Sequence, residues 1–362
     1  LNGQEYGRTP ALLKDILIGT YTLELSKEGY ARESREITIE EGKVLPVNIE
    51  MCSGRELTLQ TDREGDILYV DGKRIGVSPQ KLELSYGVHT IRAERGEQHT
   101  EKELEVTETG GESIVTLGFG LLSGIRWSSS VTPKQKEILS RLVGNMVQVE
   151  GGRFQMGGTP EQGSDANDWE KPVHEVTLSD YYMGKYEVRQ SEWEAVMGNN
   201  PSYFKGDDLP VEQVSWKDCH EFIGRLNALT GLSFKLPTEA QWEYAARGGS
   251  LSKSYKFSGS NDLEEVGWYG SNSGNYTHRI GEKQPNELGL YDMSGNVWEW
   301  CEDWYGDYSS DSQSDPIGAV SGSFRVYRGG SRNSGARLCR VSYRLYNAPN
   351  RRNSFLGFRL VC

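Results

Sequence analysis

The C-terminal stretch organises the chain: it runs Arg325-Val326-Tyr327-Arg328-Gly329-Gly330-Ser331, then Cys339-Arg340, and finally Leu356-Gly357-Phe358-Arg359 before Cys362. From Arg325 to Cys362 the sequence holds nine arginines and no carboxylate, while the whole chain has a formal net charge of −12. Two interpretations stay open. Either the arginines tie irregular loops together through carboxylates and carbonyls, or they belong to a surface that meets a ligand.

The composition excludes several classes of protein. A chain of 362 residues is long enough for two or three domains. Its 43 glycines and mean hydropathy of −0.63 indicate a loop-rich globular protein, and no run of 18 apolar residues could span a membrane. A pI near 5.1 argues against nucleic acid as the partner, because the field of the protein would repel phosphate.

The cysteines and histidines do not form a recognisable metal motif. Five cysteines (Cys52, Cys219, Cys301, Cys339 and Cys362) leave at least one thiol unpaired or bonded to another chain. No Cys-x-x-Cys pair occurs and the five histidines are scattered, which argues against a zinc site. Because the first residue is Leu1 and no leader precedes it, we expect a mature or trimmed product whose targeting segment cannot be read.

The first third of the chain contains a tandem repeat. Asn2-Gly3, Tyr6-Gly7 and Thr9-Pro10 recur, at a constant offset of 69, as Asp71-Gly72, Ile75-Gly76 and Ser78-Pro79. Alternating strands are predicted at residues 21–25 and 35–39 in the first copy, and at 89–93 and 102–106 in the second. Each copy is therefore predicted to be a small antiparallel β-module.

The two modules resemble PEGA domains, small β-sandwich modules of bacterial surface and envelope proteins. The resemblance implies a spacer or a contact with the cell wall, since no residue set in either copy could carry out chemistry. We place the first module at residues 1–51, truncated at its start, and the second at 52–118. A linker with a short helix, whose N-terminus is Thr132-Pro133, is predicted for residues 119–142. The large domain is predicted to occupy residues 143–362.

Local patterns in the large domain predict strands first and helices after them. Residues 146–149 and 152–157 are expected to form a hairpin, and residues 173–178 another half-buried strand. Three helices are expected from Gln190, from the cap Ser215 and from the capping box Thr238-x-x-Gln241. Beyond Gly249 the periodicity fades, so side-chain networks or ions are expected to hold the remaining segment.

A series of motifs carries a second resemblance. In order, it comprises Gly151-Gly152-Arg153-Phe154, Leu236-Pro237-Thr238-Glu239, Gly289-Leu290-Tyr291-Asp292, Gly295-Asn296-Val297-Trp298-Glu299-Trp300, Arg328-Gly329-Gly330-Ser331 and Gly357-Phe358-Arg359. The series resembles the formylglycine-generating enzyme (sulfatase-modifying factor) family, which has a variant of the C-type lectin fold. The fold class implied is α+β: one large irregular C-type-lectin-like domain preceded by two small all-β sandwich modules.

The resemblance does not decide the activity, since this fold serves both oxidases and binding proteins. The family's oxidases bind copper with two cysteines, and those positions hold Ser334 and Cys339 here, so one ligand is missing. Leu338 and Phe355 also replace a tyrosine and an asparagine of the family, whereas Ser331 and Trp298 are retained. Cys339 and Cys301 are expected to form either a structural disulfide or two buried thiols.

The resemblance also implies a structural calcium ion. The matching ligands are the side chains of Asp292 and Glu299 and the carbonyls of Gly295 and Val297, which are the hard oxygen donors that Ca²⁺ prefers. The alternative is that Asp292 caps the turn while Glu299 pairs with an arginine of the tail.

The tail further resembles the variable proteins of diversity-generating retroelements, which display a C-terminal block of diversified residues on a lectin-like fold. The ligand-binding residues predicted here are Arg332, Asn333, Ser334, Leu338, Tyr343, Leu345, Tyr346, Asn347, Ser354 and Phe355. Among them, Tyr343, Leu345, Tyr346 and Phe355 are expected to lie together on an exposed face rimmed by Arg332, Arg344 and Asn347.

The function expected is that of a ligand-binding protein, displayed on the cell envelope or secreted, that binds a protein or glycan and performs no catalysis. The alternative is a copper-dependent oxidase of the formylglycine-generating type that uses Cys339, with Ser331 and Trp298. A third possibility is a structural subunit whose tail pairs with another protein.

Overall fold

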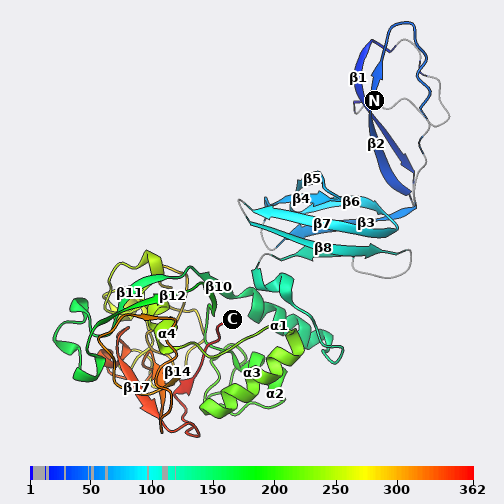
Figure 1. The fold of residues 1–362 in the computed structure, drawn as a ribbon. Coiled ribbons are helices and arrows are strands. Elements are labelled where there is room, and N and C mark those ends of the chain that lie inside the picture. Colours follow the sequence, from blue (N-terminus) through cyan, green and yellow to red (C-terminus); the bar gives the residue numbers. More distant parts are fainter. Residues whose placement is uncertain are drawn as a thin grey trace. The chain divides into compact units, whose positions relative to one another are not determined.

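The computed structural model describes residues 1–2, 13, 16–27, 30–47, 49, 53–61, 64–95, 98–107, 113–118 and 120–362. The chain forms two compact units, Leu1–Ser123 and Gly124–Cys362 (Figure 1). The small unit is built from β-strands, and the large unit combines short helices with several small sheets, so the predicted α+β class is confirmed. Among the described residues, no helix has both the length and the apolar character that crossing a bilayer requires.

The first module contains one antiparallel hairpin, β1 (Gly19–Lys27) with β2 (Tyr30–Ile39). Asn2 has a φ of 48° and makes two hydrogen bonds with Thr22. Its N–H donates to the Thr22 carbonyl, and its Oδ1 accepts the Thr22 N–H. Asp71 has the same φ and makes the same two bonds with Thr90, which agrees with the repeat. The other turn residues of the first copy, Gly3, Tyr6, Gly7, Thr9 and Pro10, lie outside the described residues, as does Cys52.

The second module is a sandwich of two sheets with strand orders β6-β3-β9 and β5-β4-β7-β8. Alternate residues of both sheets, among them Leu59, Leu68 and Ile91, point between the sheets and form one apolar core. The strands are β3 (Gly54–Thr61), β4 (Ile67–Val70), β5 (Lys73–Val77), β6 (Gln80–Ser85), β7 (Gly87–Arg95), β8 (Gln98–Val106) and β9 (Ile114–Leu117).

The helices of the large unit begin where the capping residues predict. Thr132, Ser215 and Thr238 each close a capping box at the start of α1, α3 and α4, so two backbone N–H groups at each of these helix starts are satisfied. The helices are α1 (Pro133–Gly144), α2 (Gln190–Met197), α3 (Trp216–Thr230), α4 (Glu239–Ala246) and α5 (Leu263–Val266). Short 3₁₀ turns lie at Gly120–Gly124, Pro160–Asp165, Asp168–Glu170, Gly249–Leu251 and Ala336–Cys339.

The predicted hairpin between residues 146–149 and 152–157 is wrong. β10 (Met146–Val149) pairs with β13 (Tyr181–Gly184), and β11 (Gly152–Met156) pairs with β12 (His174–Leu178), which also contacts β15 (Gln313–Ser314). Gly151 lies between the two strands, where an added Cβ would stand 2.3 Å from the Leu178 carbonyl oxygen. Alternation of apolar residues identified the strands correctly, but it carries no information about the partner strand.

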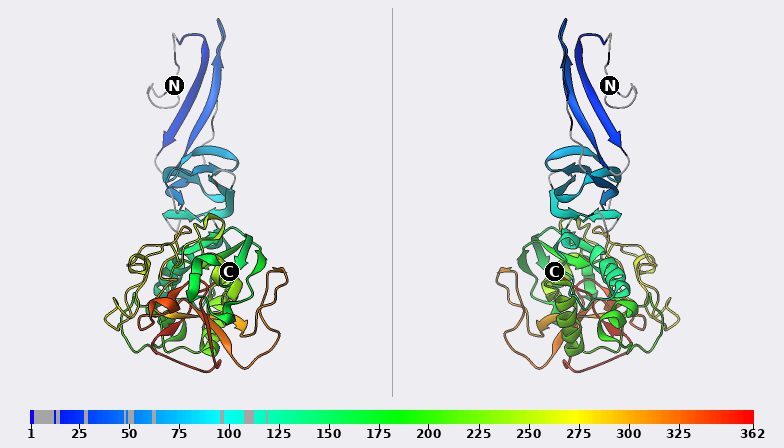
Figure 2. Two further views of the ribbon diagram at one scale, coloured as in Figure 1. Left: turned by 90° about the vertical axis from the view of Figure 1, so that its left-hand side faces the viewer. Right: turned by 90° about the vertical axis from the view of Figure 1, so that its right-hand side faces the viewer.

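A four-stranded sheet with the order β17-β16-β14-β18 organises the tail. Its strands are β14 (Trp298–Trp304), β16 (Arg325–Arg328), β17 (Arg344–Asn347) and β18 (Leu356–Gly357). In Figure 2 the orange segment between β14 and β16 forms a loop that extends from the body of the large unit. Exposed Ile317 and Val320 lie in this loop.

The strand register gives this sheet two sides of different chemistry. On the inner side, Cys301 and Val326 join the main apolar core with Trp242 of α4, and Arg328 lies directly opposite Arg344. On the outer side, Trp300 lies opposite Tyr327, which in turn lies opposite Leu345. Successive residues of a strand point to opposite sides, so every tail residue in a strand is assigned to one side or the other.

Candidate functional site

The tail arginines of the inner side are buried and paired with carboxylates from distant segments. Arg344 binds Glu239 through two hydrogen bonds, of 2.8 Å from Nε and 2.6 Å from Nη2. Arg328 pairs with Glu239 at 3.2 Å and with Glu243, and it donates to the Tyr343 carbonyl at 2.6 Å. Burial alone would raise the pKa of Glu239, but Arg344 and Arg328 outweigh it and the pKa is lowered.

Two further buried arginines repeat this arrangement. Arg340 holds both oxygens of Glu170, at 2.7 and 2.9 Å, and Arg359 holds both oxygens of Glu299, at 2.6 Å each. Burial opposes ionisation of Glu170, yet the hydrogen bonds from Arg340 and Ser342 lower its pKa. Forked pairs of this kind fix both orientation and distance. For these arginines the structure therefore supports the first of the two interpretations, a scaffold role.

The ten predicted ligand-binding residues divide into buried and accessible groups. Buried are Arg332, Ser334 and Tyr343, so the prediction that Arg332 and Arg344 rim an exposed patch is wrong. Tyr343 is 7% exposed and packs 6.1 Å from the Trp298 ring. The prediction that Tyr343 lies on an exposed face is therefore wrong, because its ring packs with Trp298 on the outer side of the sheet. The remaining seven, Asn333, Leu338, Leu345, Tyr346, Asn347, Ser354 and Phe355, are exposed or half-buried.

The accessible residues do not form the single cluster that was predicted. Tyr346 points to the inner side of the sheet, where its ring lies 4.2 Å from Tyr305 and 5.0 Å from Phe324. Leu345 belongs to one edge strand and Phe355 adjoins the other, and β16 and β14 lie between them. Three strand spacings correspond to about 14 Å. The accessible residues Asn333, Leu338, Leu345, Asn347, Ser354 and Phe355 are together called the tail surface.

Arg332 links the tail surface to two loops that the sequence analysis did not select. Its guanidinium donates to the Oδ1 and carbonyl of Asn275, at 2.6 and 2.8 Å, and to the Oγ of Ser354 at 3.1 Å. It also stacks 4.7 Å from the centre of the Phe204 ring. The neighbouring Tyr203 and Tyr276 are exposed and touch the same ring. A local composition of Asn, Ser, Gly and Tyr was the one feature of the sequence that could have identified these loops.

The positions that bear the two copper ligands in the family's oxidases hold no thiol pair here. The Ser334 hydroxyl lies 3.0 Å from both the backbone nitrogen and the Oγ of Ser331, inside the loop. Cys339 is buried beside Phe257 and Leu263, and burial raises the pKa of its thiol to about 12. A thiol with this pKa supplies almost no thiolate near neutral pH, and the thiolate is the form that binds metals.

The predicted alternative of a disulfide between Cys301 and Cys339 is wrong. The described cysteines, Cys219, Cys301, Cys339 and Cys362, are all free. Cys301 lies in the main core with Trp242, whereas Cys339 lies in a separate cluster with Phe257. The second expectation, two buried thiols, is the one that the structure shows.

Three buried carboxylates surround Arg359 near the predicted calcium ligands. Glu299 is fully engaged by Arg359 and by the Trp242 indole, at 2.6 Å, as the alternative to a calcium ligand expected. Asp292 accepts the Gly281 N–H through Oδ2, while its buried Oδ1 has no hydrogen-bond partner. Glu187, which the sequence analysis missed, accepts the N–H of Val297 at 3.1 Å.

The charge of this cluster is not balanced by Arg359 alone. Burial, followed by the charges of Asp292 and Glu299, raises the pKa of Glu187 well above its usual range. Burial likewise raises the pKa of Asp292 to about 6. Among the described residues, no group of three or more His, Cys, Asp or Glu side chains has a geometry that would by itself hold a metal. The open oxygen of Asp292 fits a cation, and the occupied carboxylate of Glu299 does not.

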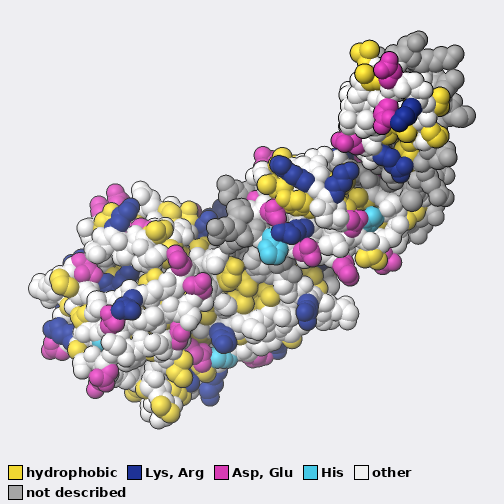
Figure 3. Space-filling model, turned by 45° about the horizontal axis from the view of Figure 1, so that its top comes forward, with side chains coloured by type: hydrophobic (Ala, Val, Ile, Leu, Met, Phe, Trp, Pro, Cys, Tyr) yellow, Lys and Arg dark blue, Asp and Glu magenta, His cyan; other side chains and the backbone are white. Residues whose placement is uncertain are grey.

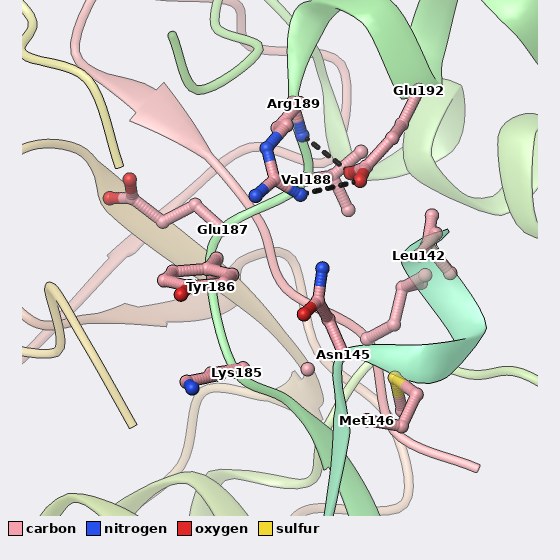
Figure 4. Close-up of a pocket in the computed structure, with 11 residues that line it drawn as sticks. Leu142, Asn145, Met146, Lys185, Tyr186, Glu187, Val188, Arg189 and Glu192 are labelled. Carbon is pink, nitrogen blue, oxygen red and sulfur yellow. Dashed lines mark hydrogen bonds and ion pairs between the residues drawn. The ribbon is translucent and has the colours of Figure 1, made fainter. Parts of the chain in front are cut away.

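A small cavity lies beside this cluster, between α1, α2 and the segment that follows β13 (Figure 4). Lys185, Tyr186, Arg189 and Glu192 contribute to its lining, and Arg189 is held by hydrogen bonds to Glu192. Its volume of about 20 Å³ accommodates roughly one water molecule. The cavity is therefore too small to be a ligand site.

The second module contains a serine, a histidine and an aspartate in contact, but they do not form a nucleophilic triad. His89 Nδ1 lies 2.7 Å from the Asp71 carboxylate, and Nε2 lies 2.9 Å from the Ser85 carbonyl and 3.3 Å from its Oγ. A ring nitrogen that donates to a carbonyl has no lone pair with which to take the hydroxyl proton. The three residues clamp a turn of the module.

The face of the molecule in Figure 3 shows acidic and basic side chains interspersed over the large unit. No broad basic area lies on that face of the kind that a nucleic acid would require.

Comparison with known proteins places both units. Residues 132–362 match the sulfatase-modifying factor enzyme 1-like domain, and residues 1–55 match the PEGA domain. The chaperone protein LppX of Paenibacillus barcinonensis is 34% identical over 249 residues, which cover 55% of this chain and 82% of LppX. The formylglycine-generating enzyme of Streptomyces coelicolor is 33% identical over 191 residues, which cover 48% of this chain and 58% of the enzyme.

Solved structures also resemble more than half of the chain. Variable protein 1 of Treponema denticola is 38% identical, with a TM-score of 0.54 and coverage of 60% of this chain and 94% of its own. PvdO from Pseudomonas aeruginosa is 26% identical, with a TM-score of 0.53 and coverage of 60% and 93%. The first similarity agrees with the resemblance of the tail to variable proteins. The match over 132–362 spans most of the chain, and the protein belongs to the family of sulfatase-modifying factor enzyme 1-like domains.

Proposed function

We propose that the large unit is a ligand-binding domain whose tail surface contacts the ligand, and that it has lost the oxidase chemistry of its family. One observation carries the proposal: the serine at position 334 is hydrogen-bonded into its own loop, and Cys339 is buried with a pKa raised to about 12. Copper and oxygen chemistry in this family depends on a pair of soft thiolates. The likeness to Treponema denticola variable protein 1 supports the same conclusion.

The buried arginine pairs explain how such a surface could vary without unfolding the domain. Arg340 and Arg344 hold the segments on either side of Val341–Tyr343 through Glu170 and Glu239. Accessible side chains such as Leu345 and Phe355 are not part of these pairs. A rigid frame with exchangeable accessible side chains is the arrangement that binding proteins use to change partners.

We also propose that the protein is displayed on the cell envelope or secreted. The match of residues 1–55 to the PEGA domain supports this location, because the PEGA domains that the small unit resembles occur on bacterial surface and envelope proteins. Surface biotinylation of intact cells that carry the gene is the direct measurement. Labelling of the chain in intact cells is expected, and labelling only after lysis would contradict the proposal.

We further propose that a calcium ion binds at the turn around Gly295. The open Oδ1 of Asp292 and the excess of buried carboxylates favour a cation, with the carbonyls of Gly295 and Val297 as further donors. Glu299 would coordinate the ion only through an oxygen that also accepts a hydrogen bond from Arg359. The role of such an ion would be structural, since it would neutralise Glu187 and Asp292 beside the frame.

The binding proposal is tested by selection from a phage library of small folded protein domains, with the full chain as immobilised target. Selected binders are then titrated against Leu345→Ala, Phe355→Ala and the control Ile317→Ala, an exposed residue of the loop between β15 and β16. Binders that lose at least about tenfold in affinity to the first two variants, and not to the control, are expected. Binders that respond to neither tail variant would contradict the proposal.

A further inference from the structure

Two loops outside the tail present the most exposed aromatic side chains of the described large unit. Tyr203, which follows α2, is 69% exposed, and Tyr276, which follows α5, is 62% exposed. Single exposed aromatic residues are common, but both tyrosine rings contact Phe204 and so form one patch, and exposed apolar patches mark interaction sites. Their position next to Arg332 connects them with the tail surface.

The two tyrosines are held against one ring. The ring centre of Tyr203 lies 4.9 Å from that of Phe204 at 86°, and the Tyr276 ring lies 5.4 Å from the same ring at 68°. The Arg332 guanidinium also lies over Phe204, 4.7 Å from the centre of the ring. Edge-to-face contacts of this kind fix aromatic rings without covering them. Tyr203, Phe204 and Tyr276 are together called the tyrosine platform.

The backbone beneath the first loop is anchored by buried polar side chains. Glu212 accepts the Phe204 N–H at 2.8 Å, and Gln190 donates to the Phe204 carbonyl at 2.8 Å. Ser202 is joined to Glu212 through its hydroxyl, and Asn200 donates to Gln190. Because Gln190 and Glu212 are buried, the loop presents Tyr203 in a fixed position.

The second loop is anchored to the tail itself. The hydroxyl of Ser273 donates to the Arg332 carbonyl at 2.5 Å, and Arg332 donates back to Asn275. Asn275 has a φ of 67°, a conformation that asparagine tolerates better than most residues. Arg332 also holds Ser354, so the platform and the tail surface share one arginine.

The composition of these segments indicates the kind of partner. Residues 199–204 read Asn-Asn-Pro-Ser-Tyr-Phe and residues 271–276 read Ser-Asn-Ser-Gly-Asn-Tyr, and the adjoining tail residues are Asn333, Ser334, Gly335, Asn353, Ser354 and Phe355. None of them is charged, in a chain of which 25% is charged. Tyrosine with Ser, Gly and Asn is the composition of antibody paratopes, where rigid aromatic rings supply contact area and small polar residues adapt.

We propose that the tyrosine platform is the fixed half of a paratope-like surface that binds a folded protein, and that the tail surface is its second half. The inference rests on the proposed binding function and adds two anchor residues, Tyr203 and Tyr276, and a class of partner. Rigid exposed tyrosines surrounded by small polar residues become hot spots when a partner excludes water from them.

The same domain-library selection tests this inference with different variants. Binders selected on the full chain are titrated against Tyr203→Ser, Tyr276→Ser and Ile317→Ala, and a printed glycan array is probed with the full chain in parallel. Most binders are expected to lose at least about tenfold in affinity to each tyrosine variant and to keep their affinity for Ile317→Ala. Thermal unfolding of each variant must remain that of the parent, because both side chains are exposed.

The outcomes separate this inference from the proposal on which it rests. Binders that depend on Leu345 or Phe355 but not on either tyrosine would leave the binding function standing and overturn the platform. Binders that depend on none of these residues would overturn both. A glycan signal that disappears in Tyr203→Ser and Tyr276→Ser would overturn the protein as the class of partner.

Discussion

The two sides of the four-stranded sheet use opposite chemistry. The inner side buries arginines against carboxylates, as in Arg344 with Glu239, whereas the outer side carries the aromatic rings of Trp298, Trp300 and Tyr327. A buried charge must be paired, so each inner arginine requires its carboxylate partner for the domain to remain stable. An accessible uncharged residue has no such requirement. One short segment therefore supplies both the buried pairs that hold the domain together and accessible side chains that take no part in those pairs.

The largest effect is expected from breaking an inner pair. Arg340→Met leaves Glu170 buried without its partner and should lower the free energy of unfolding by about 3 to 5 kcal/mol in urea titrations. The double variant Arg340→Met with Glu170→Gln should recover part of this loss, because it removes the uncompensated charge. A loss below about 1 kcal/mol for the single variant would show that the pair is not part of the frame.

A calcium ion bound at Asp292 should stabilise the native state. An ion that binds the native state at a hundredfold excess over its Kd stabilises the protein by about 2.7 kcal/mol. Chelation should therefore lower the melting temperature of the parent chain but not that of Asp292→Asn, which retains an acceptor for the Gly281 N–H. An equal response of both proteins to the chelator would rule out Asp292 as a ligand.

The carboxyl group beneath the platform should make stability depend on pH. Burial is the largest cause that raises the pKa of Glu212 from 4.5 to about 7, and its Oε2 has no hydrogen-bond partner. The native state thus retains a proton that the unfolded state loses, so stability is lost as pH rises from 4.5 through 7. At 1.36 kcal/mol per pKa unit, the parent should lose roughly 2 kcal/mol relative to Glu212→Gln between pH 5 and pH 8.

Urea titrations of both proteins at the two pH values measure this difference. Glu212→Gln keeps an oxygen that can accept the Phe204 N–H, so the comparison isolates the charge. Parallel curves for parent and variant would mean that Glu212 is already ionised in the native state at pH 5.

The smallest predicted effects on stability come from two neighbouring residues of β17 whose side chains lie on opposite sides of the sheet. Tyr346→Ala removes ring contacts with Tyr305 and Phe324 on the inner side and should cost about 1 kcal/mol. Asn347→Ala, on the outer side, should change stability by less than about 0.5 kcal/mol, because its amide accepts only the N–H of the next residue. Equal losses would contradict the assignment of the two side chains to different environments.

Local features were predictable because their causes lie within a few residues. The capping boxes at Ser215 and Thr238 and the turn at Asp71 are decided by neighbouring side chains, and all three were correct. The pairing of β10 with β13 was not predictable, since alternation is the same for any partner strand.

The candidate site was less predictable because its contacts span the chain. Arg340 meets Glu170, 170 residues away, and Arg344 meets Glu239, 105 residues away. From the sequence alone these partners are unknown, so the arginines could equally have been predicted as exposed. For the same reason Tyr343 could not be assigned to either side of the sheet. Tyr203 and Tyr276 were not predicted as site residues because they lie in loops, where no periodic pattern separates exposed from buried rings.

Whether the large unit binds a ligand in place of oxidising a cysteine can be measured by supplying everything that an oxidase would need. The full chain is incubated with copper, oxygen and a sulfatase peptide that contains the target cysteine, and the peptide is analysed by mass spectrometry. With Ser334 and a buried Cys339 at the two ligand positions, the cysteine should remain unmodified beyond the level produced by copper alone. Formylglycine that forms with the parent chain and disappears with Cys339→Ser would contradict the claim.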